Sequence, residues 1–187
     1  MLISFVQRFS RISRATGAAR GMMAGASLAA GLVALPGTGA ARNVVAYNPG
    51  VEAGTVVISA RQRSLFLVMG NGTAIRYPVA VPKSGKEWSG YAHIDGKYVN
   101  PDWVPPTVVK RDHPELPDFI RGGSPHNPMG VRALTLDRNQ VAIHGTTHKM
   151  RASVGTAASY GCIRMLNEDV VDLYERVNVG TTVVMMP

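Results

Sequence analysis

Cysteine is almost absent from the 187-residue sequence, and the one that occurs is Cys162, in the segment TAASYGCIRML. A single thiol cannot form an internal disulfide, which excludes a small fold held together by disulfides. Three uses of the thiol remain open: an inert buried group, a bridge to another molecule, or a nucleophile. Gly161 precedes the cysteine and Arg164 follows two residues later, so its surroundings are those of a turn.

Aromatic residues are scarce as well, at 6% of the chain, and basic residues outnumber acidic ones, which leaves a net charge of +8. No dense basic run is interleaved with aromatic residues, so the chain lacks the signature of a nucleic-acid-binding module. We therefore expect no nucleic acid partner. The positive charge suits an anionic polymer or a substrate that carries carboxylates, and a soluble basic surface explains it equally well.

Acidic residues are missing altogether from residues 1–41, which contain four arginines and the apolar run MMAGASLAAGLVALP. That run is shorter than the ~20 apolar residues that span a bilayer. A basic start, a short apolar segment and a small-residue ending are typical of a secretory signal. We therefore predict that residues 1–41 are a signal peptide cleaved after Ala40 or Ala41, with an uncleaved anchor as the alternative. The protein is then exported, without a membrane span after cleavage.

Residues 42–187 are long enough for one domain with a real core. We divide them into a short N-terminal segment, 42–53, and a domain, 54–187. Apolar and β-branched runs predict about three strands between residues 55 and 81, and further strands at 132–136, 140–145 and 181–186. The many prolines of residues 82–119 predict a long loop without regular elements over most of its length.

One segment has a convincing helical pattern, NEDVVDLYERV at residues 167–177. Asn167 is positioned to cap its start. Val170, Leu173, Tyr174 and Val177 fall on one face, which is expected to be buried. The expected fold class is therefore β-rich, mainly β of the α+β kind, with one or two packed helices.

Side chains suited to nucleophilic chemistry gather in the last third of the chain. A cysteine attacks as a thiolate and, with an ordinary pKa near ~8.5, needs help at neutral pH. A histidine within hydrogen-bond reach gives that help as a general base. Gly161 permits an exposed turn whose N–H groups can bind an oxyanion, and Arg164 can hold a carboxylate. The candidates are His144, His148, Ser159, Tyr160, Cys162 and Arg164.

Each candidate also has a structural explanation. His144 could be a core histidine, Arg164 a partner in a surface ion pair, and Tyr160 an aromatic residue that packs inward. A zinc site made of His144, His148 and Cys162 is not expected. Zinc proteases carry their i, i+4 histidines on a helix with a glutamate, whereas AIHGTTH lacks the glutamate and is not helical.

The segment AIHGTTHKMRASVGTAASYGCIRMLNEDVVDLYERV resembles the catalytic segment of the bacterial L,D-transpeptidases, the YkuD-like domain. That family has a His-Gly pair, a variable loop, and then Ser/Thr-His-Gly-Cys followed by an apolar residue and Arg or Asn. The resemblance extends to NPDWVPP and GGSPHNPMG and covers residues 54–187. It implies a β-sandwich of the L,D-transpeptidase type, with no metal and no cofactor.

The resemblance also implies roles for these residues. Cys162 would be the nucleophile and His144 its base, with the carbonyl of Gly145 orienting the imidazole. Backbone N–H groups around Tyr160, Gly161 and Cys162 would bind the oxyanion. The residues with orienting, oxyanion-binding or substrate-binding roles would be Gly145, Ser159, Tyr160, Gly161 and Arg164.

The substrate implied by the resemblance is the tetrapeptide stem of peptidoglycan. The thiol would attack the carbonyl of the third residue, release D-alanine, and pass the acyl group to an acceptor amine. That amine would belong to a neighbouring stem, or to an outer-membrane protein or lipoprotein. Export together with this family resemblance implies the periplasm of a Gram-negative envelope.

One departure stands out: Tyr160 occupies the position where the family usually carries histidine immediately before Gly-Cys. The base His144 is present, so the departure affects rate and acceptor choice more than the reaction class. Two alternatives remain. An L,D-carboxypeptidase or hydrolase would use water as the acceptor, and a non-catalytic peptidoglycan-binding module would keep the fold without the reaction. The presence of both His144 and Cys162 favours an enzyme.

Overall fold

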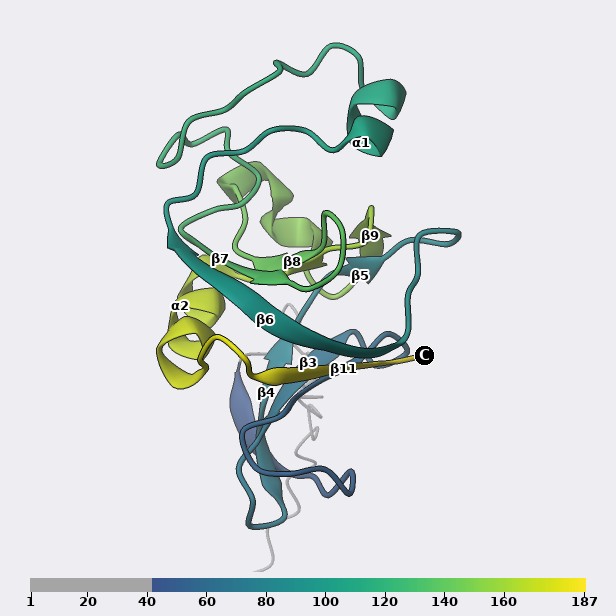
Figure 1. Ribbon diagram of the computed structural model, residues 1–187, viewed down its shortest axis with the longest axis vertical. Helices are drawn as coiled ribbons and strands as arrows, with labels where there is room; N and C mark the ends of the chain where they lie inside the picture. Colours follow the sequence, from purple (N-terminus) through teal and green to yellow (C-terminus); the bar gives the residue numbers. More distant parts are fainter. Residues whose placement is uncertain (1–41) are drawn as a thin grey trace, which may run out of the picture. The chain divides into compact units, whose positions relative to one another are not determined.

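The computed structural model describes residues 42–187. The signal peptide predicted for residues 1–41 lies outside the described residues. Nine strands form one large sheet in the order β1-β4-β3-β2-β11-β6-β7-β8-β10, and β5 pairs with β9 in a small second sheet (Figure 1). The strands are β1 (Asn43–Ala46), β2 (Val56–Ser59), β3 (Ser64–Val68), β4 (Thr73–Pro78), β5 (Val81–Pro82), β6 (Gly90–Val99), β7 (Arg132–Leu136), β8 (Ala142–His144), β9 (Ala157–Ser159), β10 (Ile163–Arg164) and β11 (Thr182–Met186).

Most of the predicted strands are present. The segment 55–81 forms the hairpins of β2, β3 and β4, and the three later predictions correspond to β7, β8 and β11. The helices are few: α1 (Thr107–Asp112), the 3-10 helix η1 (His148–Ser153) and α2 (Asn167–Arg176). The expected β-rich fold is confirmed. Among residues 42–187, no helix has the length and apolar character needed to cross a membrane.

Strand β6 joins the two halves of the large sheet. Its first residues pair with β11, its later residues pair with β7, and the register shifts between Ile94 and Gly96. An irregularity of this kind bends a strand. β6 therefore leads from the half built by β2, β3 and β4 to the half that carries β7 and β8 (Figure 1). One core cluster draws fully buried residues from both halves, among them Ile58, Leu65, Leu134 and Ile143.

The prediction of a long loop at residues 82–119 is wrong at β6 and at α1. β6 buries Ala92, Ile94 and Gly96 and exposes most of the residues between and beyond them. Only one of these three inward residues is large and apolar, so the alternating pattern is weak in the sequence. Pairing with β7 and β11, which lie far along the chain, accounts for the strand.

Helix α2 packs its apolar face onto the sheet as predicted, with Val170 and Leu173 fully buried and Val177 just beyond its end 2% exposed. The predicted capping role of Asn167 is wrong. The N-cap position is Leu166, and no side chain caps the helix. The Asn167 carboxamide instead accepts a hydrogen bond from the Thr146 N–H and donates one to the Thr146 carbonyl, at 2.9 and 3.0 Å.

Candidate active site

Parallel pairing of β8 with β10 places His144 beside Arg164. Alternate residues of an extended chain share a face, so Cys162, two residues before Arg164, faces the same side as His144. These three residues line one cavity of about 550 Å³ together with Ser159 and Tyr160. We call it the catalytic cavity. It gathers five of the seven predicted site residues, and the two glycines lie in the adjacent backbone.

The imidazole of His144 is buried, at 4% exposure. Its Nδ1 lies 2.8 Å from the carbonyl oxygen of Gly145. A carbonyl only accepts, so Nδ1 carries the proton and Nε2 is the nitrogen that can take another. Burial and the positive charge of Arg164 lower the pKa of His144 to about 4, against the opposing effect of the carbonyls of Gly145 and Pro128. The imidazole is therefore neutral at pH 7.

The thiol of Cys162 is only partly exposed, and its Sγ lies 3.6 Å from the carbonyl oxygen of Gln140. Burial raises the pKa of Cys162 above its ordinary value, although the N–H of Ala142 and the charge of Arg164 act in the opposite direction. The sulfur therefore keeps its proton at neutral pH. The resting pair is a neutral thiol and a neutral imidazole, which is the arrangement that general-base activation of a nucleophile requires.

The turn before the thiol is held by side chains. Ser159 donates from Oγ to the carbonyl of Cys162 and accepts from the N–H of Gly161 at 3.3 Å. Trp88 donates from Nε1 to the carbonyl of Gly161 at 2.9 Å. Gly161 has φ 133°, a backbone conformation that favours glycine. Within residues 42–187, the N–H groups of Tyr160 and Cys162 have no hydrogen-bond acceptor, so they are free to bind a ligand oxygen.

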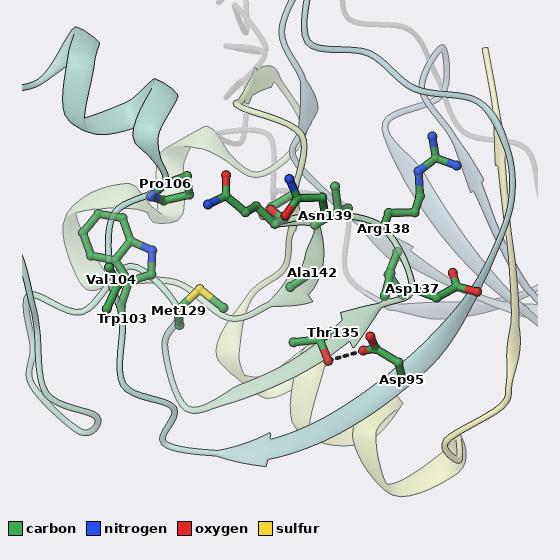
Figure 2. Close-up of a pocket in the computed structure, with 14 residues that line it drawn as sticks. Asp95, Trp103, Val104, Pro106, Met129, Thr135, Asp137, Arg138, Asn139 and Ala142 are labelled. Atoms are coloured by element: carbon green, nitrogen blue, oxygen red, sulfur yellow. Dashed lines mark hydrogen bonds between the residues drawn. The ribbon is translucent and has the colours of Figure 1, made fainter.

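A second cavity of about 680 Å³ also reaches Cys162. It shares Cys162 and six other residues with the catalytic cavity, among them Trp103, Pro106 and Met129. Figure 2 shows these residues together on one side, with Asp95 and Thr135 joined by a hydrogen bond on another. The two cavities therefore adjoin, and Cys162 lines both of them.

Comparison with protein families assigns the fold to a known group. The model of the YkuD family, the L,D-transpeptidase catalytic domain, matches residues 53–185. The chain belongs to the L,D-transpeptidase family. The match extends from just before β2 to the last strand, so it contains the whole catalytic cavity.

Individual relatives agree with the family model. The chain is 34% identical over 141 residues to the probable L,D-transpeptidase YbiS of Escherichia coli, a match that covers 71% of this chain and 44% of that protein. The chain thus spans less than half the length of this relative. An L,D-transpeptidase from Mycobacterium smegmatis has the same fold, with a TM-score of 0.57 at 16% identity over 71% of this chain and 58% of that one.

A third comparison gives a different name. A structure described as a probable carnitine operon oxidoreductase from Brucella melitensis is 39% identical, with a TM-score of 0.51 over 78% of this chain and 92% of that one. Since that name belongs to another reaction class, the family assignment here depends on the family model and on the curated relatives.

The glycine of the His-Gly pair, Gly145, has a physical explanation in this structure. A Cβ on Gly145 would collide with the Asn167 carboxamide. That carboxamide holds both backbone groups of Thr146, so it fixes the chain next to the carbonyl that orients His144. Asn167 is thus a site residue that sequence reasoning missed, because an asparagine at a helix start is indistinguishable from a cap in sequence.

Tyr160, the departure from the family pattern, is surrounded by polar groups from other segments. The ammonium of Lys83 lies 3.6 Å from the centre of its ring, and His113 meets the ring edge-on at 6.2 Å. Its neighbour His113 follows α1 and also lines the catalytic cavity, as does His126. His148, the remaining candidate, begins η1 and does not line the catalytic cavity, whereas Met150 of the same helix does.

Proposed function

We propose that this protein is an L,D-transpeptidase that cuts tetrapeptide stems of peptidoglycan through an acyl-enzyme on Cys162. The observation that carries the proposal is the shared cavity of His144 and Cys162, with a neutral imidazole and two free N–H groups beside the thiol. Membership of the L,D-transpeptidase family supports the same reaction class. We also propose export to the periplasm, on the basis of residues 1–41.

In the first half of the reaction, Nε2 of His144 takes the thiol proton while Sγ of Cys162 adds to the carbonyl carbon of the third stem residue. The negative charge that develops on the carbonyl oxygen is met by the N–H groups of Tyr160 and Cys162. The imidazolium then protonates the leaving nitrogen. The C–N bond breaks, D-alanine departs with a free amino group, and a thioester remains on the sulfur.

In the second half, an acceptor amine attacks the thioester carbon and gives its proton to His144. The C–S bond breaks, a new amide forms, and the sulfur regains a proton from the imidazolium. Arg164 is 8% exposed and lines the catalytic cavity. Its charge favours the departing thiolate, and its fork of donors suits the terminal carboxylate of the donor stem. The second cavity offers the acceptor its own approach.

The decisive experiment follows the products on defined substrates. Purified protein is incubated with tetrapeptide muropeptides, and products are identified by mass spectrometry. We expect released D-alanine and cross-linked dimers from the wild type, and neither from Cys162→Ala. Tripeptide without dimers would indicate water as the acceptor and therefore a carboxypeptidase. The absence of D-alanine release from the wild type would refute the proposal.

A further inference from the structure

A third cavity, of about 1030 Å³, lies between the N-terminal segment, the β2–β3 turn, β4, η1 and the start of α2. None of its lining residues belongs to the lining of the catalytic cavity. We call it the arginine basin because its lining includes five arginines: Arg42, Arg61, Arg63, Arg76 and Arg151. Among residues 42–187, two carboxylates, Glu168 and Asp169, line it with them, which leaves a formal charge of +3.

Two of the five arginines are already paired with carboxylates. Arg151 makes a two-pronged ion pair with Glu168, at 3.1 and 2.8 Å. Arg42 lies 3.5 Å from Asp172 and 3.9 Å from Asp169. These contacts use up most of the negative charge near the basin.

The other three arginines have no such partner. Within residues 42–187, no carboxylate lies within 4.0 Å of Arg61, Arg63 or Arg76. Arg63 donates from Nη1 to the carbonyl of Gly155 at 3.2 Å, and Arg76 donates from Nε to Ser64 at 3.0 Å. Each of these bonds fixes the direction of a guanidinium and leaves its other donors free. The basin is therefore a partly oriented set of donors.

Asp169 lines the basin but does not pair with these three arginines. The residue is 4% exposed, and its Oδ2 has no hydrogen-bond partner within the described part of the chain. Burial raises the pKa of Asp169, with the charge of Arg42 acting in the opposite direction. Its one ion-pair partner in the described part of the chain is Arg42, at 3.9 Å, so it does not pair with the three other arginines.

The basin and the catalytic cavity lie on the two sides of η1. Met150 lines the catalytic cavity, and the next residue, Arg151, lines the basin. The two cavities therefore border the same short helix, at consecutive residues. The substrate of the proposed reaction is a polymer, and each stem that has not been cross-linked ends in a carboxylate.

We propose that the arginine basin is a second, non-catalytic binding site for the carboxylates of stem peptides next to the stem that is being cut. This inference rests on the proposed function. A guanidinium binds a carboxylate through two parallel hydrogen bonds, and three guanidinium groups without a carboxylate partner among the described residues suit a ligand with several carboxylates. Two attachments to one polymer raise the effective concentration of stems at Cys162. Soluble single stems gain nothing from this second attachment.

The test compares binding to the polymer with turnover of a soluble stem. Arg61→Gln, Arg63→Gln and Arg76→Gln are combined in the full chain, and sedimentation with purified sacculi measures the bound fraction. We expect at least a fivefold weaker affinity for sacculi and a smaller dependence of binding on salt. Release of D-alanine from soluble tetrapeptide muropeptides should stay within twofold of the wild type.

The matched control removes three exposed charges elsewhere, through Arg111→Gln, Arg121→Gln and Lys149→Gln. It should bind sacculi like the wild type, and thermal unfolding verifies that both triple variants are folded. Equal loss in both variants, or no loss in the basin variant, would overturn the inference. D-alanine release by the wild type reports on the proposed function separately, because it is measured without sacculi.

A further experiment identifies which anionic group the arginine basin binds. Sacculi whose carboxylates have been converted to amides should no longer bind through the basin, so the wild type and the basin variant should bind them equally. If the wild type still binds amidated sacculi better than the basin variant, and polyphosphate competes for that binding, the basin recognises phosphates and the carboxylate assignment is wrong.

Discussion

At the scale of single residues, Arg164 affects both reacting groups. Its positive charge disfavours the imidazolium of His144 and favours the thiolate of Cys162. Burial acts on both groups in the direction of the neutral form, because a low-dielectric surrounding penalises charge. The pair therefore stores no separated charge at rest, and in the proposed reaction the proton moves as the sulfur adds to a carbonyl carbon.

This resting state predicts an unusual pH profile for acylation of Cys162 by a carbapenem. The pKa of His144 is about 4, so the imidazole is a competent base from about pH 5 upward. The raised pKa of Cys162 keeps the thiolate scarce below about pH 8. We expect an acylation rate that is nearly flat between about pH 5 and 8 and falls as the pH drops toward 4. Mass spectrometry of samples quenched at set times measures this rate.

His144→Gln gives the comparison for this profile. Without the base, only the thiolate reacts, so the rate should be low and should rise about tenfold per pH unit below the thiol pKa. A wild-type profile that rises in the same way would mean that His144 does not act as the base. An inflection near pH 6.5 would mean that its pKa is not lowered.

Five of the predicted site residues line the catalytic cavity, and they could be proposed because one short segment resembles the family motif. His144, Ser159 and Cys162 belong to one segment, and β8 and β10 bring that segment together. The surroundings of Tyr160 were not predictable. Lys83 and His113 come from segments tens of residues away, and no local pattern connects them with the motif.

At the scale of elements, Asn167 connects the start of α2 to the end of β8. Its carboxamide fixes Thr146 through two hydrogen bonds and lies against Gly145. The carbonyl of Gly145 in turn orients the imidazole. In the proposed reaction, the helix thereby helps to position the general base, which makes Asn167 a positioning residue.

We predict that Asn167→Ala lowers kcat for D-alanine release by on the order of 10²-fold with little change in KM, because the imidazole loses its fixed direction while the cavity remains. Stability should fall by about 1–3 kcal/mol, since two buried backbone groups lose their partners. Steady-state kinetics and chemical denaturation measure the two effects.

Two further variants make this prediction specific. Asn167→Asp keeps the acceptor for the Thr146 N–H and loses the donor to its carbonyl, so its kcat should lie between those of the wild type and Asn167→Ala. Asn178→Ala removes an exposed asparagine just beyond the same helix and should change neither kcat nor stability. A loss of stability with unchanged kcat in Asn167→Ala would contradict a positioning role.

Predictability also differs between elements. β7 was found with its bounds, because RALTL is a short run rich in apolar and β-branched residues that lies between turn residues. β6 was missed, since its inward residues include one alanine and one glycine. Its existence depends on partners on both sides, and tertiary pairing of this kind overrides local preference.

At the scale of the whole described domain, β11 holds the two halves of the sheet together. It pairs in parallel with β2 and antiparallel with β6, so it lies between the N-terminal hairpins and the strands that lead to the catalytic cavity. Val183 and Met185 point into the common core, at 0% and 2% exposure. The sequence identifies this strand but does not show that it lies at the centre of the sheet. Strand order depends on pairing between segments that are far apart in the sequence.

We therefore predict that Met185→Ala destabilises the domain by about 2–5 kcal/mol, the usual cost of removing a large buried side chain. Urea unfolding followed by tryptophan fluorescence reports on Trp88 and Trp103 near the catalytic cavity, and far-ultraviolet circular dichroism reports on all strands. The two transitions should coincide and shift together, because one core spans both halves.

The control is Met69→Ala, at a methionine that is 46% exposed, which should leave the unfolding midpoint unchanged. Separate transitions would mean that β11 does not couple the hairpins to the site, and the catalytic half would then fold on its own.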